Sequence, residues 1–171
     1  MFLEPLVPAD DGDLPGPLLT ELTALYASNH AFFALSGDFP DPGAIRTEQV
    51  AAALADELAT PGTRVLLARS EGRLVAVAVT LDRHPARADD PDPWIGLLLV
   101  DARVHRAGWG RRVAAAVEER FRAAGRTGLR LAVLENNPQG LAFWTSLGYE
   151  LLDRRADLRH GRPCAVLRKP L

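Results

Sequence analysis

The sequence predicts a single α/β domain with a mixed sheet. Two helix-like segments open the chain, a strand hairpin follows, and a strand–helix–strand–helix order leads to two last strands. The chain has 171 residues, 47% of them hydrophobic and 25% charged, so one domain can bury a stable core without cross-links. Residues 1–171 contain no linker and no internal repeat, and we expect them to fold as one unit.

The first third is predicted to be mainly helical. Residues 15–30 place Leu22 and other apolar side chains at helical spacing behind two prolines, which predicts a first helix. Residues 46–59 predict a second helix, with Thr47 as its cap and a Pro-Gly pair behind it. Residues 31–45 are aromatic but contain two glycines and two prolines, so we expect a loop or a bent helix there.

The rest of the chain alternates strands and helices. Residues 63–82 hold two apolar runs around Ser-Glu-Gly-Arg, which predicts an antiparallel hairpin. Residues 94–100, Trp-Ile-Gly-Leu-Leu-Leu-Val, are apolar on both faces, as is typical of a central strand. The other predicted elements are a helix over 104–125 with Val113, Ala116, Val117 and Phe121 buried, a strand over 129–135, a helix over 137–148, and strands over 149–158 and 162–171.

Composition excludes several classes of function. The net charge of −2 offers no general attraction to nucleic acid, and no apolar run approaches the roughly 18 residues of a membrane helix. Cys164 is the single cysteine and the amino terminus is unlike a signal peptide, so we expect a cytoplasmic protein. The four histidines and Cys164 lack ligand spacing, so we expect no metal, and Cys164 reads as a buried small side chain rather than a nucleophile.

Charge is distributed unevenly along the chain. Residues 1–60 hold ten acidic side chains and Arg46 as their single arginine or lysine, whereas residues 61–171 hold nineteen basic and twelve acidic side chains. One interpretation is a solvated surface with no further meaning. The other is a bipartite molecule, in which the later part holds an anionic ligand and the earlier part a cationic one.

The segment Val-His-Arg-Ala-Gly-Trp-Gly-Arg-Arg-Val predicts a phosphate site. Gly108 and Gly110 bring bare backbone to the start of a helix, where free amides attract anions. Cations surround them, at Arg103, Arg106, Arg111 and Arg112. A dinucleotide site is disfavoured, because Val113 occupies the third glycine position and the glycines do not follow their strand directly.

Together with a second segment, this motif resembles the GNAT acyltransferase superfamily, whose members carry acetyl from coenzyme A to an amine. The family signature Gln/Arg-x-x-Gly-x-Gly/Ala is matched by His105, Arg106, Ala107, Gly108, Trp109 and Gly110. The second signature is matched at the same spacings by Asn137, Gly140, Phe143, Trp144, Gly148 and Tyr149. The resemblance implies a single GNAT-like domain whose mostly antiparallel sheet has helices on both faces and splayed central strands.

The resemblance also implies a set of residues that bind acetyl-CoA, the expected cosubstrate. They are Leu98, Leu99 and Val100 beside the thioester arm, His105, Arg106, Ala107, Gly108, Trp109, Gly110 and Arg111 at the pyrophosphate, and Asn137, Phe143 and Trp144 beside the pantetheine. His105 replaces the usual Gln or Arg, which weakens a side-chain contact to phosphate. Trp144 replaces a tyrosine that protonates the departing thiolate in many relatives, and an indole cannot act as that acid. We therefore expect Trp144 to pack in the core.

The expected reaction is N-acetyltransfer to a primary amine by direct attack in a ternary complex. The central strand lacks the glutamate that relatives often place there, so the candidate bases are Asp38, His84 and Asp92. The acidic first third favours a small cationic amine as acceptor, bound by Tyr26, Phe32, Phe33 and Asp38. Acylation of a protein or peptide and a non-catalytic CoA-binding regulatory module are the alternatives. A homodimer is an assembly that the sequence permits but does not require.

Overall fold

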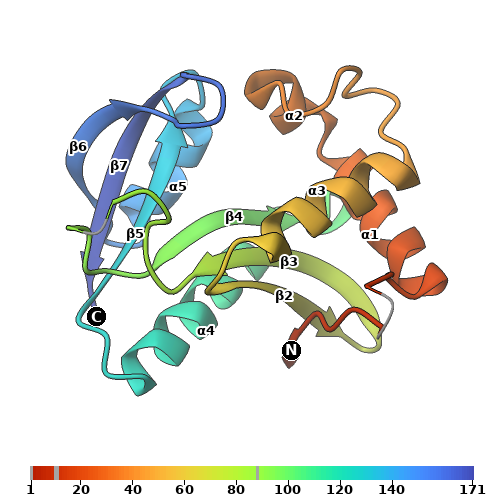
Figure 1. The fold of residues 1–171 in the computed structure, drawn as a ribbon, viewed down its shortest axis with the longest axis horizontal. Coiled ribbons are helices and arrows are strands. Elements are labelled where there is room, and N and C mark those ends of the chain that lie inside the picture. Colours follow the sequence, from red (N-terminus) through yellow and green to blue (C-terminus); the bar gives the residue numbers. More distant parts are fainter. Residues whose placement is uncertain (1, 10–11, 88) are drawn as a thin grey trace.

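The structure, a computed structural model, describes residues 2–9, 12–87 and 89–171. Figure 1 shows the arrangement of the helices and strands. Their order is β1 (Phe2–Pro5), α1 (Gly16–Ser28), α2 (His30–Ser36), α3 (Thr47–Ala59), β2 (Thr63–Ser70), β3 (Arg73–Leu81), β4 (Trp94–Val100), the 3-10 turn η1 (Ala102–Val104), α4 (Trp109–Ala123), β5 (Gly128–Leu134), α5 (Pro138–Ser146), β6 (Glu150–Ala156) and β7 (Pro163–Pro170).

The described strands form one sheet in the order β1-β2-β3-β4-β5-β7-β6. All neighbours run antiparallel except β4 and β5, which run parallel and pair at two positions alone, Trp94 with Arg130 and Ile95 with Leu131. Beyond Ile95 the two strands part, and the β5-β7-β6 half turns away from the β2-β3-β4 half (Figure 1). This confirms the predicted fold class, a mostly antiparallel α/β sheet whose central strands splay.

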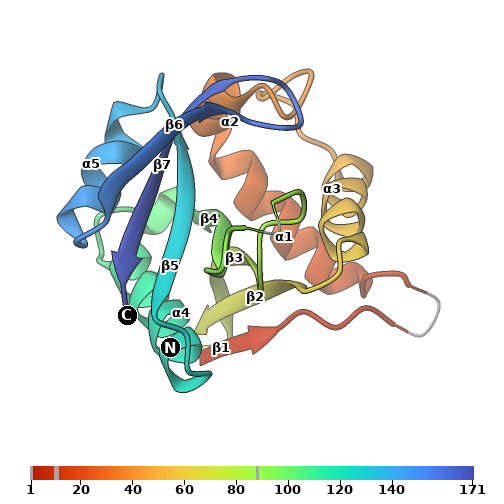
Figure 2. The ribbon, with the colours of Figure 1, turned by 60° about the vertical axis from the view of Figure 1, so that its left-hand side comes forward.

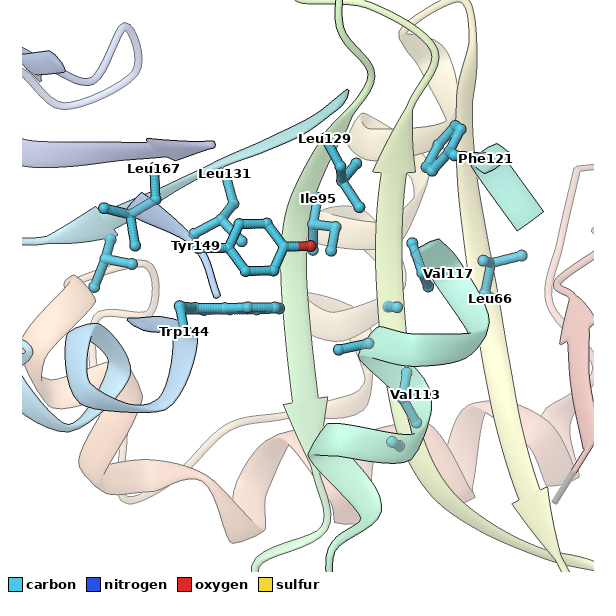
Figure 3. Packing of buried hydrophobic residues seen from close by; sticks show 14 of the residues in the cluster. Leu66, Ile95, Val113, Val117, Phe121, Leu129, Leu131, Trp144, Tyr149 and Leu167 are labelled. Atoms are coloured by element: carbon cyan, nitrogen blue, oxygen red, sulfur yellow. The ribbon is translucent and has the colours of Figure 1, made fainter. Parts of the chain in front are cut away.

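Two apolar cores lie on the two faces of this sheet. On one face α4 and α5 pack against the strands through Val113, Val117, Phe121 and Trp144 (Figure 3). The opposite face carries the cluster of the first three helices, with the side chain of Val50 from α3 fully buried. Because β4 has helices on both of its faces, its apolar sequence is explained by burial of both sides.

Several elements differ from the sequence predictions. The strand β1 was not predicted, and it forms because its backbone pairs with β2, a partner more than sixty residues away. The predicted loop or bent helix is a helix over His30–Ser36 followed by an irregular connection, and Arg46 rather than Thr47 occupies the cap of α3. On α4 the predicted buried position Ala116 is partly exposed. The buried stripe instead includes Glu118, which accepts hydrogen bonds from Tyr149 and Lys169.

Candidate functional site

The open stretch of β4 exposes backbone groups to the gap between the two halves of the sheet. Asp101 donates its amide to the carbonyl of Val75 on β3 at 2.9 Å. Bonding alternates along an antiparallel pair, so Leu99 also bonds to β3, while the backbone groups of Leu98 and Val100 face the gap. Of the three residues predicted to meet the thioester arm, Leu98 and Val100 therefore present free backbone and Leu99 does not.

The carboxyl end of β4 is fixed by two side chains. The carbonyl of Val100 accepts a hydrogen bond from Nδ2 of Asn29 at 3.0 Å, and it lies 2.8 Å from Nε2 of His105. Nε2 must carry the proton to donate to a carbonyl. His105 therefore holds the strand end in place. Three backbone groups are then free to hydrogen-bond a ligand: the amide and the carbonyl of Leu98 and the amide of Val100.

The turn between β4 and α4 leaves a set of backbone amides free. Arg106 has φ 62° and Gly108 has φ 80°, so both adopt the left-handed conformation. Within the described residues, the amides of Arg106, Gly108, Trp109, Gly110 and Arg111 donate no hydrogen bond. Four of these five amides stand at the amino end of α4, where the helix dipole favours an anion. The turn therefore forms a concentrated set of donors beside the open end of β4.

The arginines around this turn fall into two groups. Arg103 is ion-paired with the buried carboxylate of Asp101 at 2.6 Å, which removes it from the predicted phosphate contacts. Arg106 and Arg111 are exposed and make no ion pair with any described residue. Arg112 stacks its guanidinium over Trp109, 4.8 Å from the ring centre. Positive charge free to meet a phosphate thus comes from Arg106 and Arg111 first.

The two sequence signatures meet in space. A Cβ added to Gly110 would lie 3.1 Å from Cζ of Phe143 on α5 and 3.7 Å from Cγ2 of Val100 on β4. The absence of a side chain at Gly110 therefore lets α4, α5 and β4 converge. Gly110 has a packing role, and a bulky residue there would displace Phe143.

Asn137 and Trp144 both have structural roles in α5. Asn137 caps the helix, its Oδ1 accepting the amide of Gly140 at 2.9 Å, and its Nδ2 has no partner among the described residues. Trp144 is 9% exposed and packs edge-to-face against Tyr149 (Figure 3). It makes a second edge-to-face contact with Phe143. The packing role predicted for Trp144 agrees with this burial, and the free Nδ2 of Asn137 faces no competing acceptor.

A cavity of about 460 Å³ opens on the face of β4 opposite α4, beneath the first three helices. It lies where β4 parts from β5, because Gly96 and Leu97 of β4 and Ala132 of β5 all line it. Its polar and aromatic lining comprises Tyr26, Phe33, Asp38, Phe39, Asp56, Glu57, Thr60, His84, Arg87, Trp94, Arg155, Asp157, Arg159, Arg162 and Cys164. Both this cavity and the free amides of the α4 turn thus border the open stretch of β4.

The connection between β6 and β7 lies beside α2 (Figure 2), and its Asp157, Leu158, Arg159 and Arg162 line the cavity. Its Arg162 donates to Oδ1 of Asp38 at 3.0 Å and to the carbonyl of Ser36, and it also pairs with Asp157. Arg159 lies 3.4 Å from Asp56 on α3. The acidic first third is therefore partly matched by arginines of the same chain, which explains part of the charge asymmetry without a ligand.

The three predicted bases lie in different surroundings. Asp38 lines the cavity but is paired with Arg162. His84 also lines it; burial lowers its pKa, and its Nδ1 accepts the amide of Ala86 at 3.1 Å, which leaves the proton on Nε2. Asp92 does not line the cavity, and burial opposes its ionisation, but hydrogen bonds from Arg168 and Arg130 hold its pKa below the ordinary range. Asp92 is thus a buried ion-pair residue, and the geometry does not support its prediction as a base.

The predicted acceptor aromatics are mostly core residues. Tyr26 and Phe33 are 3% and 2% exposed and stack on one another, with ring centres 5.5 Å apart. Phe32 packs against the same cluster and does not line the cavity. Cys164 is buried, which raises the pKa of its thiol and agrees with the prediction of a small core side chain. The aromatic groups therefore form a wall of the cavity rather than a cage.

The sequence profile of the acetyltransferase (GNAT) family matches residues 25–149, which is most of the chain. The chain belongs to the GNAT acetyltransferase family. The match includes both signatures, the open end of β4 and two of the helices that cover the cavity. Among curated protein sequences, none matches significantly.

Solved structures share this GNAT fold over the whole chain. An acetyltransferase from Thermus thermophilus has a TM-score of 0.71 at 24% identity, covering 100% of this chain and 98% of that chain. PH1933 from Pyrococcus horikoshii OT3 has a TM-score of 0.69 at 15% identity, covering 99% and 98%. The ribosomal-protein-S18-alanine N-acetyltransferase from Escherichia coli has a TM-score of 0.65 at 17% identity, covering 99% and 92%.

No described helix is long and apolar enough to cross a membrane. No group of three or more His, Cys, Asp or Glu side chains in the described part of the chain is arranged to hold a metal ion.

Sequence reasoning missed three residues of the GNAT site. Asn29 reaches the end of β4 from the end of α1, Arg162 closes the cavity, and Glu57 lines it without a partner among the described residues. Asn29 and Arg162 act on residues 71 and 124 positions away. No local motif marks such contacts. Glu57 stands in an ordinary helical pattern, where a carboxylate normally faces solvent.

Proposed function

We propose that the protein transfers an acetyl group from acetyl-CoA to the primary amine of a small cationic molecule, by direct attack in a ternary complex. The observation that carries this proposal is the position of the open stretch of β4 between the free amides of α4 and the cavity. A ligand on each side would bring its reactive group to the same strand end. Glu57 and the small volume of the cavity favour a compact cationic acceptor.

The residues at the α4 turn fit the phosphates of coenzyme A. The amides of Gly108 to Arg111, with Arg106 and Arg111, would hold the pyrophosphate, because unpaired donors and charge at a helix amino end bind such anions. The free backbone of Leu98 and the amide of Val100 would pair with the pantetheine arm, and Nδ2 of Asn137 would donate to it. When bound, acetyl-CoA supplies an activated acyl carbonyl and a good leaving thiolate.

A thiol-release assay with acetyl-CoA across a panel of amines tests the function. We expect release with compact cationic amines and none with acidic or neutral ones. Release with a peptide amino terminus alone would favour protein acylation. Stabilisation by CoA without any release would favour a non-catalytic binding module, and CoA at about 100 times its Kd should add roughly 2.7 kcal/mol of apparent stability. Absence of that stabilisation would reject the cofactor site itself.

A further inference from the structure

We propose that Glu57 is the proton acceptor for the amine, an assignment that rests on the proposed function. Glu57 lies in the last turns of α3, is partly buried, and lines the same cavity as Gly96 and Leu97 of β4. Its carboxylate makes no hydrogen bond or ion pair with any described residue. A partly buried carboxylate without a partner is costly unless something else, such as a bound ammonium, supplies one.

The other carboxylates that line the cavity already form ion pairs with arginines. Asp38 and Asp157 both accept from Arg162, and Asp56 pairs with Arg159 and is mostly exposed. Each of these carboxylates would have to leave a cation before it could take a proton from an amine. Glu57 needs no such rearrangement.

The neutral groups of the cavity are poor bases for other reasons. His84 carries its proton on Nε2, because its Nδ1 accepts a backbone amide. Burial raises the pKa of Tyr26 and that of Cys164, so both stay protonated and can only donate. Among the described carboxylates that line the cavity, Glu57 is thus the one without a partner. Arg87 also lines the cavity and makes no ion pair with a described residue, but a guanidinium cannot accept a proton.

The charges that face Glu57 set its basicity. Burial raises its pKa, and the carboxylates of Asp38 and Asp56 raise it further, whereas the guanidinium of Arg159 lowers it. Burial raises the pKa of Tyr26, the Glu57 carboxylate raises it further, and both side chains line the cavity. A carboxylate with a raised pKa is a better base, because proton transfer is most efficient when the pKa approaches the working pH.

The chemical step balances with Glu57 as the proton carrier. The ammonium of the acceptor gives one proton to the Glu57 carboxylate, and the free amine then attacks the acetyl carbonyl carbon. The C–N bond forms, the C–S bond breaks, and the departing thiolate takes the second proton from the same nitrogen. Glu57 then releases its proton to water, so the reaction yields amide, CoA thiol and one proton.

Kinetics of Glu57→Gln test this role, with Glu48→Gln as a matched control on the exposed start of the same helix. We expect kcat/KM for the amine to fall about 10²-fold at neutral pH. The deficit should shrink as pH approaches the amine's own pKa, about 10 by analogy with lysine. Glu57→Asp should retain part of the rate and the acidic limb of the pH profile. The Kd for CoA should stay unchanged in all three variants.

Stability gives a second readout that does not depend on turnover. Because the folded pKa of Glu57 is raised, the stability it contributes is complete below the unfolded pKa of about 4.3 and is lost as pH rises through the folded pKa. The free energy of unfolding of Glu57→Gln, relative to that of the wild type, should therefore increase as pH rises from about 4 to 7. Glu48→Gln should follow the wild type.

The outcomes separate this assignment from the proposed function. If the wild type turns over and Glu57→Gln keeps both its rate and its acidic limb, the Glu57 assignment is wrong and the function stands. Loss of the acidic limb in His84→Ala instead would move the role to His84. If the wild type acetylates no amine, both proposals fail. A flat stability difference between pH 4 and 7 would also contradict an ionised, unpaired Glu57.

Discussion

On the α4 side of β4, Arg106, Arg111 and five backbone amides have no partner in the described chain. On the other side, around the cavity, most charged groups are joined in ion pairs, such as Arg162 with Asp38. An unpaired set of donors can bind a highly charged ligand without first breaking internal contacts. A cavity of paired charges is selective, because a ligand must fit around groups that are already satisfied. Glu57 and Arg87 are the charged lining residues without an ion pair in the described chain.

After Glu57→Gln, the largest expected effect concerns the backbone of the α4 turn. Gly108 and Gly125 stand just before and just after α4, with φ 80° and 75°, and an added Cβ would meet nothing within 4 Å at either. Gly108→Ala and Gly125→Ala should each lose roughly 1–2 kcal/mol of stability from left-handed strain. Only Gly108→Ala should weaken CoA binding, by tenfold or more, as calorimetry would measure.

An unchanged CoA affinity in both glycine variants would contradict the assignment of the α4 turn. An equal loss of CoA affinity in both variants would also contradict it, because it would indicate a general effect of strain on the helix. The pair therefore separates a ligand-binding turn from a conformational requirement that any helix end could impose.

A smaller effect is expected on the cavity side. Arg162→Gln removes the contacts to Asp38, Asp157 and the carbonyl of Ser36, so the β6–β7 connection loses its hold on α2. The KM for the amine should rise about tenfold. This corresponds to about 1.4 kcal/mol, close to the lower end of what a hydrogen bond to a charged group contributes. The Kd for CoA should not change. Equal changes in both constants would show that the two sides of β4 are not independent.

The smallest expected effect on catalysis is at Trp144. Trp144→Phe should cost about 1–2 kcal/mol of stability, because it removes part of a buried ring that contacts Phe143 and Tyr149. The pH dependence of kcat should not change, as a pH–rate profile would show. Loss of the alkaline limb, or a many-fold gain in turnover from Trp144→Tyr, would contradict the packing role and indicate that the ring lies at the departing thiolate.

The same two regions differ in how far the sequence predicts them. The α4 turn is built from consecutive residues, so Gly108, Gly110 and the arginines predict it directly. The splayed sheet is predicted from the family resemblance that these residues carry. Even there, the pairing of Arg103 with Asp101 depends on the buried end of β4 and was missed.

The cavity is built from side chains that meet only after folding. Asp38 and Arg162 are 124 residues apart, and each looks like an ordinary surface charge in its own segment. The same holds for Glu57, whose character comes from burial and from neighbours on other elements. This explains why two of the predicted bases, Asp38 and Asp92, are ion-paired side chains, while Glu57 was not predicted.

The central claim is that two ligands approach β4 from its two sides. An amide NMR titration of the 15N-labelled protein measures this directly. CoA should shift the amides of Gly108, Trp109, Gly110 and Arg111, together with Leu98 and Val100, while those of Glu57 and Leu158 stay in place until a cationic amine is added. If CoA instead shifted the cavity amides and left the α4 turn unchanged, the account would be contradicted.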